Sequence, residues 1–172
     1  MIPALPRSFV RLVATVLTAL LLAVLPVLDA PASASEATES TSRLTARAMS
    51  PSQQRVVNDI NYSRRSRGKR SLGTNGLMNQ RAQTWAQHLA SCQCLEHRAP
   101  PFGTPRGWCA AAENVGRSGN DGKLGQLHAA FMRSDGHRRN ILNSRWTALG
   151  VGVARDRAGE YFVVHAFADF SC

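Results

Sequence analysis

The spacing of apolar and polar residues predicts a series of helices after residue 50. Ser50 and Gln53 have the pattern of a capping box, and the apolar residues that follow share one helical face. A second amphipathic helix is expected to begin near Asn75. Residues 121–132 repeat the helical spacing, and a short helix is expected over residues 134–142.

The last part of the chain has the pattern of β-strands. Apolar residues alternate with glycine or alanine over residues 149–154, and residues 160–169 are largely apolar on both faces. The short connection between the two segments predicts an antiparallel hairpin. Helices on both sides of such a sheet place the protein in the α+β class, as a three-layer α-β-α sandwich with an antiparallel central sheet.

The segment before this domain has the composition of an export signal. Residues 1–34 combine arginines near the start, a 14-residue apolar run at residues 12–25 and small residues up to Ala34. The run is shorter than the roughly 20 residues that span a membrane, and an uncleaved anchor is the alternative. We therefore expect a secretory signal peptide over residues 1–34, a flexible linker over 35–50 and one domain over 51–172. The mature protein is then secreted and extracellular, without a transmembrane span.

The excess of basic residues indicates which classes of partner to expect. The chain has 21 Lys and Arg against 11 Asp and Glu, a net charge of +10. A basic surface attracts anions, so a lipid or an anionic surface polymer is the expected class of extracellular partner. The densest basic cluster, residues 64–70, contains no aromatic side chain on which a base could stack, which argues against nucleic-acid binding.

The cysteines of an exported domain are expected to form disulfides. Cys92, Cys94, Cys109 and Cys172 make an even number, and they allow three pairings. Two cysteines that are separated by one residue are difficult to bridge, so Cys92 and Cys94 are each expected to pair with Cys109 or Cys172. Of the two pairings that remain, we expect Cys94–Cys109 and Cys92–Cys172. A cysteine metal site is the rival interpretation, but the sequence lacks the C-x-x-C spacing that would support it.

Polar residues at the ends of three predicted elements form a candidate site. His97 follows the second helix, Glu113 follows a loop rich in proline and glycine, and His137 lies in the short helix. Two imidazoles and one carboxylate can hold a divalent cation such as Zn²⁺ and leave a position for water or a ligand. The sequence contains no H-E-x-x-H motif that would fix two metal ligands on one helix turn. Asp135 offers a further carboxylate unless it caps its own helix.

Several short motifs, taken in order, resemble the CAP superfamily (cysteine-rich secretory, antigen and pathogenesis-related proteins) in its short bacterial form. The resemblance covers residues 56–167, and no single motif in it is specific. The motifs are Ile60-Asn61 with Arg64, His97, Glu113-Asn114-Val115, Gly136-His137-Arg138, Asn140-Ile141-Leu142, and the strands at residues 149–153 and 161–167.

The resemblance implies an α-β-α sandwich with His97, Glu113 and His137 in one surface cleft. The sequence departs from the family where Ala112 replaces the glycine that usually precedes the glutamate. The second glutamate of the eukaryotic cleft would fall near Ser134, where only Asp135 supplies a carboxylate. His165 stands where the family often has glutamine, which makes it a more remote candidate for the site.

Three functions are compatible with these features. The first is an extracellular, non-enzymatic binding domain for a lipid, a sterol or another ligand, which is what family membership implies. The second is a divalent-metal-dependent hydrolase or peptidase that uses His97, Glu113 and His137, with the carboxylate or an imidazole as general base. The third is a basic protein that binds a cell surface or wall through its charge.

Overall fold

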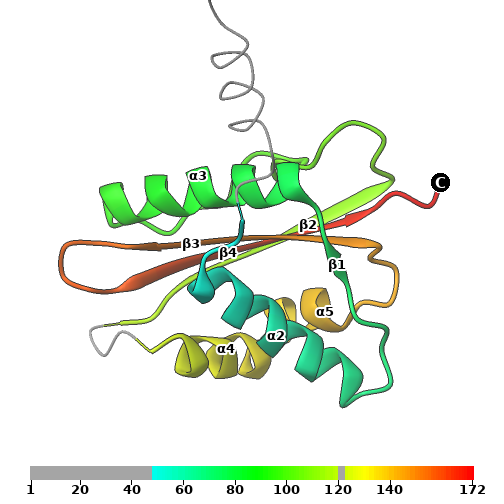
Figure 1. The fold of residues 1–172 in the computed structure, drawn as a ribbon, viewed down its shortest axis with the longest axis horizontal. Coiled ribbons are helices and arrows are strands. Elements are labelled where there is room, and N and C mark those ends of the chain that lie inside the picture. The colour runs from blue at the N-terminus through cyan, green and yellow to red at the C-terminus, as the bar shows by residue number, and fades with distance from the viewer. Residues whose placement is uncertain (1–47, 120–122) are drawn as a thin grey trace, which may run out of the picture.

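Helices cover both faces of a four-stranded sheet in the computed structural model of the chain, which describes residues 48–119 and 123–172 (Figure 1). The predicted signal peptide, residues 1–34, and most of the predicted linker, 35–50, lie outside the described residues. The elements in chain order are α2 (Pro51–Arg65), β1 (Gly73–Thr74), α3 (Gly76–Cys92), β2 (Ala110–Arg117), α4 (Leu124–Arg133), α5 (Asp135–Leu142), β3 (Ala148–Arg155) and β4 (Tyr161–Asp169).

The elements form the three layers that the sequence predicted. Helix α3 lies on one face of the sheet, and α2, α4 and α5 lie on the other (Figure 1). Strand β4 is central and is buried along nearly its whole length, in agreement with its two apolar faces. In the described part of the chain, no helix combines the length and the apolar character needed to cross a membrane.

Two of the predicted helix starts are confirmed in detail. The Ser50 hydroxyl accepts a hydrogen bond from the Gln53 backbone N–H at 3.2 Å, and the Gln53 side chain accepts one from the Ser50 N–H at 2.9 Å. The Asn75 side chain accepts a hydrogen bond from the backbone N–H of Met78 at 3.0 Å. Each bond satisfies a backbone donor that the helix itself leaves without a partner.

The sheet is mixed rather than purely antiparallel. Its strand order is β1-β3-β4-β2, with β3–β4 and β2–β4 antiparallel, so the predicted hairpin is confirmed. Strand β1 pairs with β3 in parallel through Gly73 and Thr74 only. The prediction was wrong here because a two-residue strand is too short to produce an alternating pattern in the sequence.

The contact between α3 and β3 requires the two glycines of β3. A Cβ atom on Gly152 would overlap the backbone carbonyl of Ala82, and one on Gly150 would press on Met78. Both Met78 and Ala82 are buried on the inner face of α3. The helix backbone therefore lies directly on the strand, closer than any side chain on β3 at these positions would permit.

Side-chain amides cover the outer edge of β3 beyond the end of β1. The Asn79 side chain accepts a hydrogen bond from the Val151 N–H at 2.9 Å, and the Gln53 side chain donates to the Val151 carbonyl at 2.8 Å. Gln83 both accepts from the Val153 N–H, at 3.0 Å, and donates to the Val153 carbonyl, at 2.9 Å. These residues provide the hydrogen bonds that a neighbouring strand would otherwise supply.

The predicted disulfide pairing was wrong, because the structure joins Cys92 to Cys94. Helix α3 ends at Cys92, and the next residue, Gln93, adopts the left-handed conformation with φ 54°. This turn folds the chain back, so that the Cα atoms of the two cysteines are 5.2 Å apart, within the range that a disulfide spans. The expectation that these cysteines are too close in sequence assumed a chain without such a turn.

The second disulfide joins Cys109 to Cys172. Cys109 immediately precedes β2, and the pairing of β2 with β4 sets Ala110 opposite Asp169. The two cysteines therefore leave the sheet at the same end, with their Cα atoms 5.8 Å apart. This pairing follows from strand register, which the sequence did not predict for residues 110–117.

A histidine lies at the centre of the core. His165 is in the middle of β4 with 1% of its surface exposed, and its ring centroid is 4.7 Å from that of Phe131. Burial, with smaller contributions from the charges of His128 and His137, lowers the pKa of His165 to about 3. The imidazole is therefore neutral in the folded protein at pH 7.

The neutral state of His165 predicts that acid destabilises the fold. Because the unfolded chain binds the proton at the ordinary pKa of 6.5, stability is complete above that pH and is lost as the pH falls toward 3. The free energy of unfolding should fall by about 2 kcal/mol between pH 7 and pH 5 from this residue alone. Urea denaturation across this range should show a shallower pH dependence in His165→Gln, and identical dependences in the two proteins would contradict the prediction.

Candidate functional site

Glu113 is a buried carboxylate on β2. Only 1% of its side chain is exposed, and its Oε1 accepts a hydrogen bond from the backbone N–H of Arg98 at 3.0 Å. The same oxygen is 3.0 Å from Nδ1 of His97. Burial raises the pKa of Glu113, and the hydrogen bonds from His97 and Arg98 partly offset that rise. The carboxylate therefore ties the loop after α3 to the sheet.

His137 lies in the first turn of α5, where the preceding residues hold its ring. Its Nδ1 is 2.9 Å from the hydroxyl of Ser134, and its ring meets the ring of Phe131 edge-on at 5.0 Å between centroids. Burial lowers the pKa of His137, and the positive charge of His97 lowers it further.

A chain of amide hydrogen bonds fixes α5 against β2. Asn114 is wholly buried, and its side chain donates to the backbone carbonyl of His137 at 3.1 Å. Asn140 in turn donates to the Asn114 side chain at 2.9 Å, and the indole of Trp146 donates to the Asn140 carbonyl at 2.7 Å. Asn114 follows Glu113 on the strand, so the same segment that carries the carboxylate also positions the turn that carries His137.

The far end of α5 is held by a buried arginine. Arg64 has no exposed surface, and its Nη1 donates to the carbonyls of Ile141 at 2.7 Å and Asn143 at 2.9 Å. Its Nε donates to the carbonyl of Arg70 at 2.7 Å. Since the last carbonyls of a helix lack partners within it, this cation completes the helix and complements its dipole.

The structure does not connect Asp135 with the other candidate residues. Its carboxylate pairs with Arg138 at 2.6 Å, and 72% of its side chain is exposed. Ser134 stands at the start of α5, but its side chain makes no capping bond and contacts the His137 ring instead. The sequence did not predict Ser134 as a partner of His137.

The hydrogen bonds determine which ring atoms of the two histidines can meet a ligand. Nδ1 of His97 is engaged by Glu113 and Nδ1 of His137 by Ser134, so Nε2 is the nitrogen that each ring can present. A carboxylate bound to one nitrogen of an imidazole is the usual support for metal ligation through the other. Oε2 of Glu113 is buried and has no hydrogen-bond partner in the described part of the molecule. Among the described residues, Glu113 is therefore joined to His97, but the ligand atoms of His97, Glu113 and His137 do not all lie within 4.8 Å of one another.

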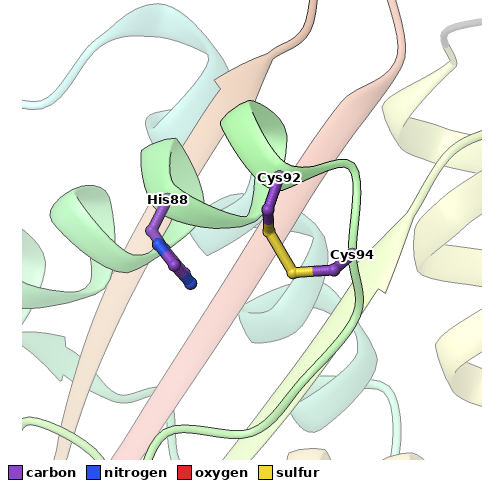
Figure 2. A group of neighbouring side chains, drawn as sticks. All are labelled: His88, Cys92 and Cys94. Atoms are coloured by element: carbon purple, nitrogen blue, oxygen red, sulfur yellow. A yellow bond between two sulfur atoms is a disulfide. The ribbon is translucent and has the colours of Figure 1, made fainter.

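A second group of possible metal ligands was not predicted from the sequence. His88, Cys92 and Cys94 are the one set of three such side chains, among residues 48–119 and 123–172, whose ligand atoms all lie within 4.8 Å of one another (Figure 2). The spacing of His88 and Cys92, four residues apart on a predicted helix, was the signal that could have revealed it.

One cavity in the described part of the molecule is lined by none of these histidines. Its volume is about 610 Å³, and it opens between the start of α2, the start of α4 and the first residue of β4. Apolar groups of Pro51, Leu124 and Tyr161 line it together with the cations of Arg55 and Lys123.

Comparison with known proteins identifies the family. The sequence profile of the cysteine-rich secretory protein family, CAP, matches residues 57–167. Because this match covers more than half of the chain, the protein belongs to the cysteine-rich secretory protein (CAP) family, and the resemblance noted in the sequence is confirmed.

A relative and two solved structures illustrate the match. The uncharacterized protein YkwD of Bacillus subtilis (strain 168) is 28% identical over 131 residues, which are 72% of this chain and 49% of the relative, so this chain spans about half of that protein. An extracellular protein from Bacillus anthracis str. Ames that contains an SCP domain has a TM-score of 0.55 at 20% identity, over 72% of this chain and 45% of that one. The structure of NaASP2 with Zn²⁺ has a TM-score of 0.52 at 15% identity, over 69% and 80%. At these identities the two structures support the fold.

The amide chain behind His137 predicts a measurable loss of stability in Asn114→Ala. The substitution leaves the partly buried Asn140 amide and the His137 carbonyl without the Asn114 side chain as a partner, which should lower the free energy of unfolding by about 2 kcal/mol. Asn58→Ala is the control, because Asn58 is exposed on α2 and bonds only to Gln54 in the described structure. Urea denaturation of both variants measures the difference, and equal stabilities would contradict the prediction.

Proposed function

We propose that this protein is a secreted CAP domain that binds an extracellular ligand, without catalysing its conversion, at the site formed by His97, Glu113 and His137. The observation that carries the proposal is the hydrogen bond between the buried Glu113 carboxylate and Nδ1 of His97. That bond orients a histidine whose other nitrogen remains for a ligand, as does the bond between Ser134 and His137.

A divalent cation is the ligand class that this arrangement supports best. The lowered pKa of His137 keeps its imidazole neutral at pH 7, and a neutral imidazole can donate a lone pair to a metal. Nε2 of His97 and Nε2 of His137 would hold the cation, and Glu113 would position His97. A bound zinc ion supplies a Lewis-acid centre at which water or a polar group of a further ligand can bind. The solved relative with Zn²⁺ is consistent with this proposal for the family fold.

Zinc titration of the mature chain with intact disulfides tests the site. Isothermal titration calorimetry should detect binding that Glu113→Gln weakens by about 10–100-fold, because the carboxylate positions a ligand rather than serving as one. His97→Ala and His137→Ala should each weaken it further. Asp135→Asn is the matched control and should bind zinc as the unaltered protein does, because Asp135 pairs with Arg138.

Two results would overturn the proposal. Zinc affinity that is unchanged in both His97→Ala and His137→Ala would show that these residues do not form a metal site. Zinc-dependent cleavage of peptide or ester substrates that disappears in His137→Ala would establish the hydrolase alternative instead.

Lipid binding is a second candidate function, and the cavity beside Arg55 and Lys123 favours it. A volume of about 610 Å³ falls within the range of small-molecule pockets. Its apolar lining, with two cations at Arg55 and Lys123, suits a single acyl chain with an anionic head group. This cavity is separate from the histidines, so the two binding functions can be tested independently.

A charge reversal at the cavity tests lipid binding. Displacement of a fluorescent fatty acid should show that Lys123→Glu weakens binding about tenfold, which corresponds to about 1.4 kcal/mol. Arg157→Glu makes the same change of charge at an exposed position outside the cavity and should have little effect. Equal losses in the two variants, together with loss of binding at high salt, would assign the interaction to the overall positive charge.

A further inference from the structure

The corner where α3 ends carries a second constellation of metal-ligating groups, distinct from the histidine site proposed above. His88 and Cys92 lie one turn apart on the same side of α3, and the left-handed Gln93 returns the chain so that Cys94 faces Cys92 (Figure 2). The ligand atoms of His88, Cys92 and Cys94 all lie within 4.8 Å of one another.

The distances suit a tetrahedral metal ion once the disulfide is open. A zinc ion binds thiolate sulfur at about 2.3 Å and imidazole nitrogen at about 2.0–2.1 Å, so tetrahedral ligand atoms lie roughly 3.5–4 Å apart. Only a small separation of the two sulfur atoms is then required. The disulfide and the metal site exclude each other, because the sulfur atoms bind either one another or the ion.

Neighbouring residues hold the His88 ring in place. The ring stacks on the indole of Trp85 with centroids 4.5 Å apart, and the guanidinium of Arg98 lies 5.3 Å from the same indole. Nε2 of His88 is 2.8 Å from Oε1 of Glu96. An imidazole that donates Nε2–H to a carboxylate presents its lone pair on Nδ1, which is the support that metal-bound histidines usually have.

The Cys92–Cys94 disulfide contributes little as a structural cross-link. A disulfide stabilises a fold mainly by restricting the unfolded chain, and the effect grows with the length of the loop that it closes. Cys92 and Cys94 are 2 positions apart, whereas Cys109 and Cys172 are separated by 63. Cys92 is also exposed, so a reductant can reach it while the domain stays folded.

We propose that reduction of the Cys92–Cys94 disulfide converts this corner into a binding site for a thiophilic divalent metal such as zinc, with His88, Cys92 and Cys94 as ligands. A dithiol reductant gives two electrons and two protons to the disulfide, which becomes two thiols while the reductant becomes a disulfide. Metal binding then releases the two thiol protons as the Sγ–metal bonds form. Water completes the coordination, and the corner becomes a metal site under the control of the redox state.

Cobalt(II) is the probe, because a thiolate bound to cobalt gives a near-ultraviolet charge-transfer absorption that histidine and carboxylate ligands do not give. The mature chain is reduced with a water-soluble phosphine, which is then removed under argon, and cobalt chloride is added. The reduced protein should develop the absorption with an equivalence point at one ion per chain, and the oxidised protein should not. Far-ultraviolet circular dichroism of each sample reports that the domain remains folded.

Variants identify the ligands. Cys92→Ser with Cys94→Ser should abolish the absorption, and any signal that persists would come from Cys109 and Cys172 and would overturn the assignment. His88→Ala should weaken cobalt affinity at least tenfold, while Gln87→Ala, an exposed neighbour on the same helix, should not. No absorption in the reduced unaltered protein, or equal affinity in His88→Ala and Gln87→Ala, would refute the proposed site. The thiolate-to-cobalt absorption does not report on metal bound at His97 or His137, because neither residue supplies sulfur.

Discussion

The close contact of α3 with β3 determines where most of the functional groups lie. Gly150 and Gly152 let the helix backbone rest on the strand, so the axis of α3 is fixed relative to the sheet. The position of its last turn then fixes the corner at Cys92 and the start of the loop that carries His97. Because that loop returns along the sheet, His97 arrives beside Glu113 on β2. A larger residue in place of either glycine would displace the helix together with everything attached to its end.

On the opposite face of the sheet, helix α5 is held in place by buried polar groups whose hydrogen bonds are satisfied. Arg64 is held by three carbonyls, and the Asn114 amide is bonded on both sides, so neither residue can leave its place without exposing unpaired partners. Together they fix α5 at its two ends, and α5 presents His137. Glu113 and His165 are different, because each keeps one buried polar atom without a hydrogen bond in the described structure. For Glu113 that atom belongs to the carboxylate that contacts His97, and for His165 burial of the ring lowers the pKa.

The sequence alone predicted the features that depend on the local pattern of residues. The capping box at Ser50, the start of α3 at Asn75, the hairpin and the three layers were all predicted, because spacing and turn chemistry determine them. The parallel strand β1 and both disulfides were not, because they depend on register between distant segments and on the left-handed conformation of Gln93. No local pattern joins His97 to Glu113, and only the family resemblance suggested their proximity. The contacts of Ser134 with His137 and of His88 with Glu96 were not predicted, because they depend on side-chain geometry.

The amide side chains along β3 affect whether another copy of the domain can add a strand to this edge of the sheet. An open strand edge is a template on which another chain can add a strand. Here Gln53, Asn79 and Gln83 already occupy the backbone groups of Val151 and Val153 through four hydrogen bonds. An incoming strand would have to displace all of them before it gained any pairing of its own. The β3 edge therefore resists the addition of another strand at Val151 and Val153, although its neighbour β1 is only two residues long.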